Sequence, residues 1–191
     1  MRSYPQRKPL RLKNHDYSQP NAYFITICTY RRQSLFWADE GLLAAAVGAH
    51  PCVRPPGGGH FSQPEIVLSK AGEMVSKWLK KIPEKYPGYT IDEYVIMPDH
   101  IHFIIICEEW PGGHVGPPLQ SVLQWFKAQT TNEYIRGVRA EVFPPFNSRI
   151  WQRTYYEHII RDQNDMQDIR RYIEENPIKW NTEKEEEYPW N

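Results

Sequence analysis

The sequence predicts an α+β fold of the ferredoxin-like kind, in which helices pack on an antiparallel β-sheet. Strand-like and helix-like segments follow one another in the order strand, helix, strand, strand, helix, strand, helix, and this order fits such a fold. With 191 residues and a hydrophobic content of 40%, the chain has the length and composition of one globular domain. No internal repeat is visible, so we expect a single domain over residues 1–191.

The first half of the chain contains a strand and a helix that can be placed from their composition. Residues 22–29 are β-branched and aromatic and predict a strand. Residues 40–47 begin a helix-like stretch. Within residues 64–85, the apolar side chains from Met74 onward have helical spacing, and Pro87-Gly88 ends the pattern.

The second half supplies the remaining elements. Two apolar runs, residues 89–97 and 99–107, are separated by a proline and predict a tightly coupled pair of strands. Residues 119–138 predict a helix, residues 149–156 a strand, and residues 165–176 a final amphipathic helix. Two segments rich in Pro and Gly, at about 48–63 and 110–118, indicate inserted surface loops.

The charges are balanced in number but not in position. The chain has 23 basic and 23 acidic residues, yet the basic residues gather near its start and a run of Glu lies near its end. A basic segment of this kind favours contact with a polyanion even when the net charge is zero. The three cysteines have no metal-ligand spacing, and no apolar run approaches the ~20 residues of a membrane span. We therefore expect a cytoplasmic protein that does not contact membranes.

His100 and His102 form a candidate metal site. They flank one residue in a predicted strand, and side chains two positions apart on a strand share a face. Two imidazoles on one face can hold a divalent cation, although two histidines alone make an incomplete site and the pattern also occurs by chance.

The final helix offers a partner for this pair. Tyr172 and Asn176 are four residues apart and therefore share a helix face. The amide oxygen of an Asn is a suitable ligand for Mg²⁺ or Mn²⁺. Taken alone, both residues are equally compatible with structural roles: Tyr172 as a core aromatic, and Asn176 as the end of the helix, because Pro177 follows it.

Three segments of the chain resemble known transposases. The stretch VIMPDHIHFIII resembles the His-hydrophobic-His strand of the HUH transposases. The segment WQRTYYEHIIRDQNDMQDIRRYIEENPIKW is similar to the C-terminal signature of the REP-associated tyrosine transposases, and RLKNHDYSQPNAYFITICTYRR resembles the opening of that family. The three segments are spread between residues 11 and 180, and the two insertions lie between them.

The resemblance implies a role for each matching residue. His100 and His102 match the paired metal ligands, Tyr172 matches the nucleophile, and Asn176 matches the third metal ligand. The implied activity is that of a metal-dependent single-stranded DNA endonuclease and strand transferase with a covalent 5′-phosphotyrosine intermediate. The implied cofactor is Mg²⁺ or Mn²⁺, and the implied partner is hairpin DNA of the REP type, bound by a monomer or a homodimer. The neighbouring Tyr155 and Tyr156 match strand positions of the family and not its nucleophile.

Two clusters combine cations with aromatic rings, the combination that binds unpaired DNA. Arg11 and Lys13 lie in the basic N-terminal segment, and Arg149, Trp151 and Arg153 form the second cluster. The alternative for these residues is structural, with the tryptophan in the core and the arginines on a solvated face.

Two other functions fit the same residues. The chain could be a DNA-binding protein of the same fold without catalysis, or a metal-dependent hydrolase whose nucleophile is water. A hydrolase leaves no covalent protein–DNA adduct, so a denaturing gel separates it from a tyrosine transposase.

Overall fold

Four strands form one antiparallel sheet in the order β2-β3-β1-β4. The computed structural model describes residues 20–38, 66–109 and 116–182. The strands are β1 (Asn21–Cys28), β2 (Tyr89–Ile96), β3 (His100–Cys107) and β4 (Tyr156–Ile160). Their β-branched and aromatic residues suit a pleated sheet that is covered on both faces.

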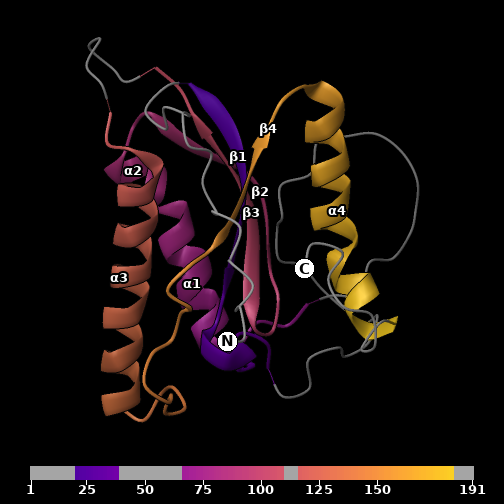
Figure 1. The fold of residues 1–191 in the computed structure, drawn as a ribbon. Coiled ribbons are helices and arrows are strands. Elements are labelled where there is room, and N and C mark those ends of the chain that lie inside the picture. Colours follow the sequence, from indigo (N-terminus) through magenta and orange to yellow (C-terminus); the bar gives the residue numbers. More distant parts are fainter. Residues whose placement is uncertain (1–19, 39–65, 110–115, 183–191) are drawn as a thin grey trace, which may run out of the picture.

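The helices lie on both sides of this sheet. α1 (Lys70–Lys80), the short α2 (Ile82–Lys85) and α3 (Leu119–Arg139) lie on one side, and α4 (Gln163–Thr182) covers the other, as Figure 1 shows. A 3₁₀ turn, η1 (Tyr30–Arg32), follows β1. The sheet order β2-β3-β1-β4, with helices between β1 and β2 and between β3 and β4 along the chain, is that of the ferredoxin-like fold. The predicted fold class is therefore confirmed.

Strand alternation divides the core into two layers. In β1, Tyr23, Ile25 and Ile27 face α1 and α3, whereas Phe24 faces α4. Side chains of β3 alternate in the same way, because successive residues of a strand point to opposite faces. The face under α4 therefore carries His100 and His102 beside the smaller of the two apolar clusters.

The start of α1 shows how local sequence positions a helix. The hydroxyl of Ser69 accepts a hydrogen bond from the Gly72 N–H at 3.1 Å, which caps the first turn. A Cβ atom at Gly72 would lie 2.2 Å from the Phe36 carbonyl oxygen, so only glycine allows this close approach. Among the described residues, no helix has both the length and the apolar composition of a membrane span.

Two predicted elements are wrong in their bounds. The expected strand at 149–156 is mostly irregular, with one bridge between Trp151 and Thr29, and the strand itself is β4, which begins at Tyr156. The apolar residues that favour a strand there, Ile150 and Trp151, are buried from a loop. This burial accounts for their hydrophobicity without a sheet ladder.

The final helix is longer than its sequence pattern predicts. The pattern places its end near residue 176, yet the helix continues through Pro177 to Thr182. A proline inside a helix removes one backbone hydrogen bond. Burial of Ile173 and Pro177 against the sheet offsets this loss. The expected helix at 40–47, the insertion at 48–63 and residues 110–115 of the second insertion lie outside the described residues.

Candidate metal and nucleophile site

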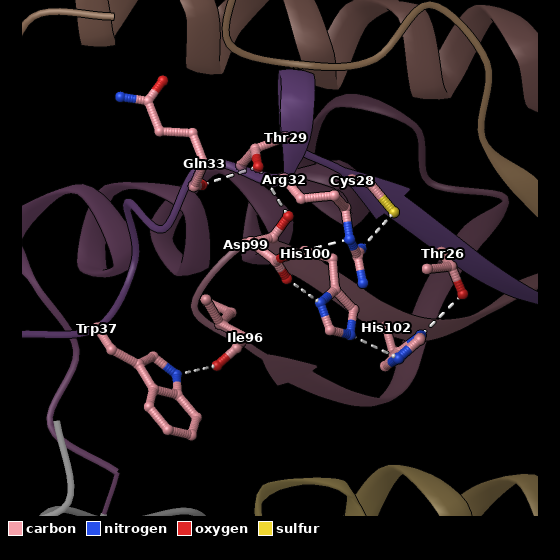
Figure 2. Close-up of polar contacts among 10 residues, drawn as sticks. All are labelled: Thr26, Cys28, Thr29, Arg32, Gln33, Trp37, Ile96, Asp99, His100 and His102. Atoms are coloured by element: carbon pink, nitrogen blue, oxygen red, sulfur yellow. Dashed lines mark hydrogen bonds and ion pairs between the residues drawn. The ribbon is translucent and has the colours of Figure 1, made fainter. Parts of the chain in front are cut away.

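The two histidines of β3 lie side by side beneath α4. Their Nε2 atoms are 2.9 Å apart, and the rings meet edge to face with centres 4.5 Å apart. His100 is 0% exposed and His102 is 2% exposed. As Figure 2 shows, the two Nε2 atoms point toward each other.

The opposite nitrogen of each ring is held by a neighbour. His100 Nδ1 lies 2.6 Å from Asp99 Oδ1, and His102 Nδ1 lies 2.8 Å from Thr26 Oγ1 (Figure 2). The carboxylate accepts a hydrogen bond from His100 Nδ1–H, so the ring lone pair of His100 lies on Nε2, where it can act as an acceptor or a ligand. The Thr26 hydroxyl can donate or accept, so it suits either tautomer of His102.

A tight turn after β1 holds the side chain of Asp99 in place. Arg31 and Arg32 both have left-handed backbone conformations, with φ angles of 58° and 55°. This turn directs Arg32 Nε to Asp99 Oδ2 at 3.0 Å and its Nη1 to the Cys28 sulfur at 2.8 Å. Thr29 holds the backbone of Asp99, because its N–H and its hydroxyl donate to the Asp99 carbonyl oxygen at 2.8 and 2.9 Å. The contacts of Arg32 and His100 with the Asp99 carboxylate therefore fix the position of the His100 ring.

Burial keeps both imidazoles neutral. It lowers the pKa of His100, an effect that the hydrogen bond donated to the Asp99 carboxylate opposes. It lowers the pKa of His102 further below the usual range, and the charge of a protonated His100 would add to this. Neutral imidazole is the form that binds a metal ion.

Helix α4 places two aromatic rings beside the histidines. The Tyr172 ring lies with its centre 5.3 Å from that of His102, and the Trp180 ring lies 5.7 Å from that of His100. Asn176, between them on the helix, hydrogen-bonds with Tyr172. Positions 172, 176 and 180 are spaced by four residues, so the three side chains share one helix face.

The surroundings of the Tyr172 hydroxyl act on its ionisation in both directions. Burial raises the pKa of Tyr172, and Tyr156 adds to this. The hydrogen bond with Asn176 and the positive charges of Lys179 and Arg32 lower it, but burial dominates. Tyr172 is therefore a phenol at neutral pH, and it needs help to become a nucleophile.

The side chains present fit a divalent metal ion. Two nitrogen ligands at ~2.1 Å on adjacent octahedral positions lie ~3.0 Å apart, and the two Nε2 atoms are already 2.9 Å apart. In the part of the chain that the structure describes, no three His, Cys, Asp or Glu side chains cluster as a metal site. Asn176, whose amide oxygen is a suitable ligand for Mg²⁺ or Mn²⁺, stays the predicted third ligand.

Four residues of this site were not identified from the sequence. Thr26 and Arg32 reach the histidines through strand pairing and a turn, which need the three-dimensional register. Asp99 immediately precedes the His pair, and Trp180 lies four residues beyond Asn176, so sequence spacing could have suggested both. The proline at 177 concealed Trp180, because it predicted that the helix would end before that residue.

The tyrosines at the start of β4 lie on different faces of the sheet. Tyr155 packs against the core under α1 and α3. Tyr156 packs on the α4 side, and its ring lies 6.4 Å from that of Phe24. Tyr156 therefore lies on the same side of the sheet as Tyr172, whereas Tyr155 lies on the opposite side.

Trp151 is not available for stacking on DNA. It is 4% exposed and packs against Phe36 and Phe126, and its indole N–H donates to the Thr130 hydroxyl at 2.8 Å. Because the ring is enclosed in the core, the predicted DNA-binding role of Trp151 is wrong.

The arginines beside Trp151 remain accessible. Arg149 stacks over the Tyr30 ring at 4.6 Å, and Arg153 is exposed. Both line a shallow cavity of about 330 Å³, together with Lys127. Lys127 donates to the carbonyl oxygen of Arg153 at 3.1 Å and so holds this segment against α3. Arg11 and Lys13 lie outside the described residues.

Comparison with known proteins identifies relatives of this chain. The family described as "Transposase IS200 like" matches residues 65–176. An uncharacterised protein of Haemophilus influenzae is 35% identical over 91% of this chain and 89% of its own length. A second protein of that organism, provisionally named REP-associated tyrosine transposase, is 32% identical over 52% of this chain and 55% of its own.

One solved structure shares the fold. It is described as a REP-associated tyrosine transposase bound to a REP hairpin, with a TM-score of 0.53 and 19% identity over 89% of this chain and 74% of that one. At this identity the likeness concerns the fold alone. The family model and the relatives confirm the resemblance stated from the sequence.

Proposed function

The chain belongs to the IS200-like transposase family, and from this premise we propose that it is a metal-dependent single-stranded DNA endonuclease and strand transferase with Tyr172 as its nucleophile. The observation that carries the proposal is the approach of Tyr172 to the histidine pair, with ring centres 5.3 Å apart at His102. The phenol of Tyr172, which hydrogen-bonds with Asn176, thus lies beside the two neutral imidazoles.

The histidines and Asn176 would hold the metal ion. When bound, Mg²⁺ or Mn²⁺ would polarise the scissile phosphate and offset its negative charge. Asp99 and Thr26 orient the two rings so that their Nε2 lone pairs face the site. Arg32 adds positive charge near Tyr172 and supports a developing phenolate.

The chemical step exchanges one phosphoester for another. The Tyr172 oxygen forms a bond to phosphorus as the bond from phosphorus to the 3′-oxygen breaks, which yields a 5′-phosphotyrosine and a free 3′-hydroxyl. The phenol gives up its proton, and the departing 3′-oxygen gains one, so the step is balanced. Attack by another 3′-hydroxyl on the phosphotyrosine rejoins the strands without ATP, because the bonds are equivalent.

The substrate we propose is hairpin DNA of the REP type with an unpaired flank. Support comes from the relative named for REP association and from the solved structure of similar fold that is bound to a REP hairpin. In this chain, Arg149 and Arg153 present cations near the end of β1 that is next to the histidine pair, where a phosphate backbone can approach.

A denaturing gel tests this proposal. With labelled hairpin DNA and Mg²⁺ or Mn²⁺, we expect a covalent adduct of the wild-type protein that disappears with chelator. Tyr172→Phe should abolish the adduct and cleavage while hairpin binding persists. Tyr156→Phe, on the same face, and Tyr155→Phe should retain the adduct.

Three results would contradict the proposal in different ways. Cleavage without an adduct would indicate water as the nucleophile. Hairpin binding without cleavage under any metal would indicate a binding protein. An adduct that persists in Tyr172→Phe would mean that another tyrosine attacks.

A further inference from the structure

Trp180 lies in the last turns of α4, at the edge of the candidate site. Its ring centre is 5.7 Å from that of His100, with the two planes tilted by 49°. It follows Asn176 by four residues and Tyr172 by eight, so it continues the helix face that carries both. The extension of α4 beyond Pro177 is what brings this ring to the histidine pair.

The exposure of Trp180 differs from that of Trp151. Trp151 is enclosed in the core and uses its indole N–H inside the protein. Trp180 is only partly buried, and it borders a pair of polar imidazoles as well as the apolar cluster under α4. Part of the Trp180 side chain is thus exposed beside the place where the phosphate would be held.

We propose that Trp180 is a stacking platform for one unpaired nucleobase next to the scissile phosphate. This inference rests on the proposed function and names a contact of the same site. A phosphate at His100 and His102 carries a sugar and base on each side, within one nucleotide of these rings. Every base has an aromatic face, so an indole at that position binds a base with little dependence on sequence.

Stacking at Trp180 also serves the chemistry. Tyr172 and Trp180 lie on the same rigid helix, so a base held by the indole fixes the strand relative to the phenol. The contact therefore positions the phosphate for attack, and it selects DNA with an unpaired base at this point.

The test combines protein variants with DNA from which one base is missing. A hairpin oligonucleotide with an unpaired flank is selected for binding from a pool randomised in the flank. Abasic sites are then placed at each unpaired position in turn. Binding is measured by fluorescence anisotropy in a Tyr172→Phe background with Mg²⁺, so that no cleavage occurs.

The expected result is a coupling at one position of the flank. In the Tyr172→Phe parent, removal of that base weakens binding ~10-fold, the typical effect of one lost stacking contact. Adding Trp180→Ala weakens binding of the intact DNA ~10-fold, and loss of the base then costs almost nothing more. Trp180→Phe retains most of the affinity, because a phenyl ring can still stack.

Trp125→Ala is the matched control. Trp125 is also partly buried, but it packs against Trp78 and Tyr86 on the other side of the sheet. It should leave every abasic effect unchanged, with circular dichroism confirming the fold of each variant.

The outcomes separate this inference from the proposed function. If the wild type forms the covalent adduct but the abasic effects are the same with and without Trp180, the stacking role is overturned. If coupling is found but no adduct forms under any metal, the stacking role stands and the proposed catalysis fails.

Discussion

The paired geometry of His100 and His102 depends on the neighbouring side chains that hold each ring. Each ring has one nitrogen bound to a neighbour, Asp99 or Thr26, and the other turned to its partner. A histidine free to rotate about its side-chain bonds would lose this alignment. The paired geometry therefore depends as much on the supporting carboxylate and hydroxyl as on the imidazoles.

Asp99→Asn tests this dependence. The amide cannot supply the negative charge that strengthens the hydrogen bond to His100 Nδ1 and raises the basicity of the ring. Loss of such a supporting partner costs ~10–100-fold in metal affinity. Titration of the purified protein with Mn²⁺ in a calorimeter should show this loss. The control is Asp92→Asn, whose partner is Arg170 and which should bind Mn²⁺ like the wild type.

The buried histidines also predict how stability depends on pH. Burial lowers the pKa of both in the folded state, so below the ordinary pKa of histidine the unfolded chain binds more protons than the folded one. Stability of the metal-free protein should therefore fall as the pH drops through ~6.5. Thermal unfolding in chelator measures this slope, and His102→Gln, which cannot be protonated, should reduce it. An equal slope in both proteins would contradict the argument.

At the scale of the element, α4 connects Tyr172, the proposed nucleophile, to the core. Ile173 is 3% exposed and packs against the sheet, whereas Ile178, five residues later, is 43% exposed. The ion pair of Arg170 with Asp92 and the hydrogen bond between His158 and Asp165 hold the same helix at partly exposed positions. Because such pairs contribute little in water, the apolar contact of Ile173 dominates the docking of the helix.

Ile173→Ala should reveal this contribution. Deleting a buried isoleucine to alanine costs ~2–5 kcal/mol in the free energy of unfolding, while Ile178→Ala at the exposed position should change it by less than ~0.5 kcal/mol. Urea denaturation of the two variants gives both values. If Ile178→Ala proved as costly as Ile173→Ala, the assignment of the buried face of α4 would be wrong.

At the scale of the whole molecule, the sequence predicted the fold well because the apolar residues of each long element repeat with the spacing of a strand or of a helix. The apolar runs of β2 and β3 and the helical spacing of α3 fell within one or two residues of their true bounds. The segment at 149–155 misled because Ile150 and Trp151 are buried from a loop, and period alone cannot distinguish this from a strand.

The site divides in the same way between what sequence can and cannot show. Strand and helix periodicity brought together His100 with His102 and Tyr172 with Asn176. The packing of α4 on β3, the pairing of Thr26 with His102 and the turn at Arg32 depend on contacts between distant segments. Such contacts have no local signature, so the sequence could not predict them.

The distribution of charge over the molecule leads to a last prediction, on DNA binding. Arg149 stacks on Tyr30, just beyond the end of β1 that pairs with His100. Lys85 lies in α2, just before the start of β2, which pairs with the far end of β3 at Cys107. We therefore expect a DNA strand that reaches the histidines to pass the arginine and not the lysine.

Arg149→Gln should weaken hairpin binding at every salt concentration and reduce the slope of log affinity against log salt by about 1, since one phosphate contact is lost. Lys85→Gln should leave both values unchanged, although it removes the same charge. Anisotropy titrations at several salt concentrations measure the two slopes, with a plain duplex of equal length as the second ligand. If duplex bound as tightly as the hairpin, or if both variants lost affinity equally, binding would follow net charge rather than a path across the end of the sheet.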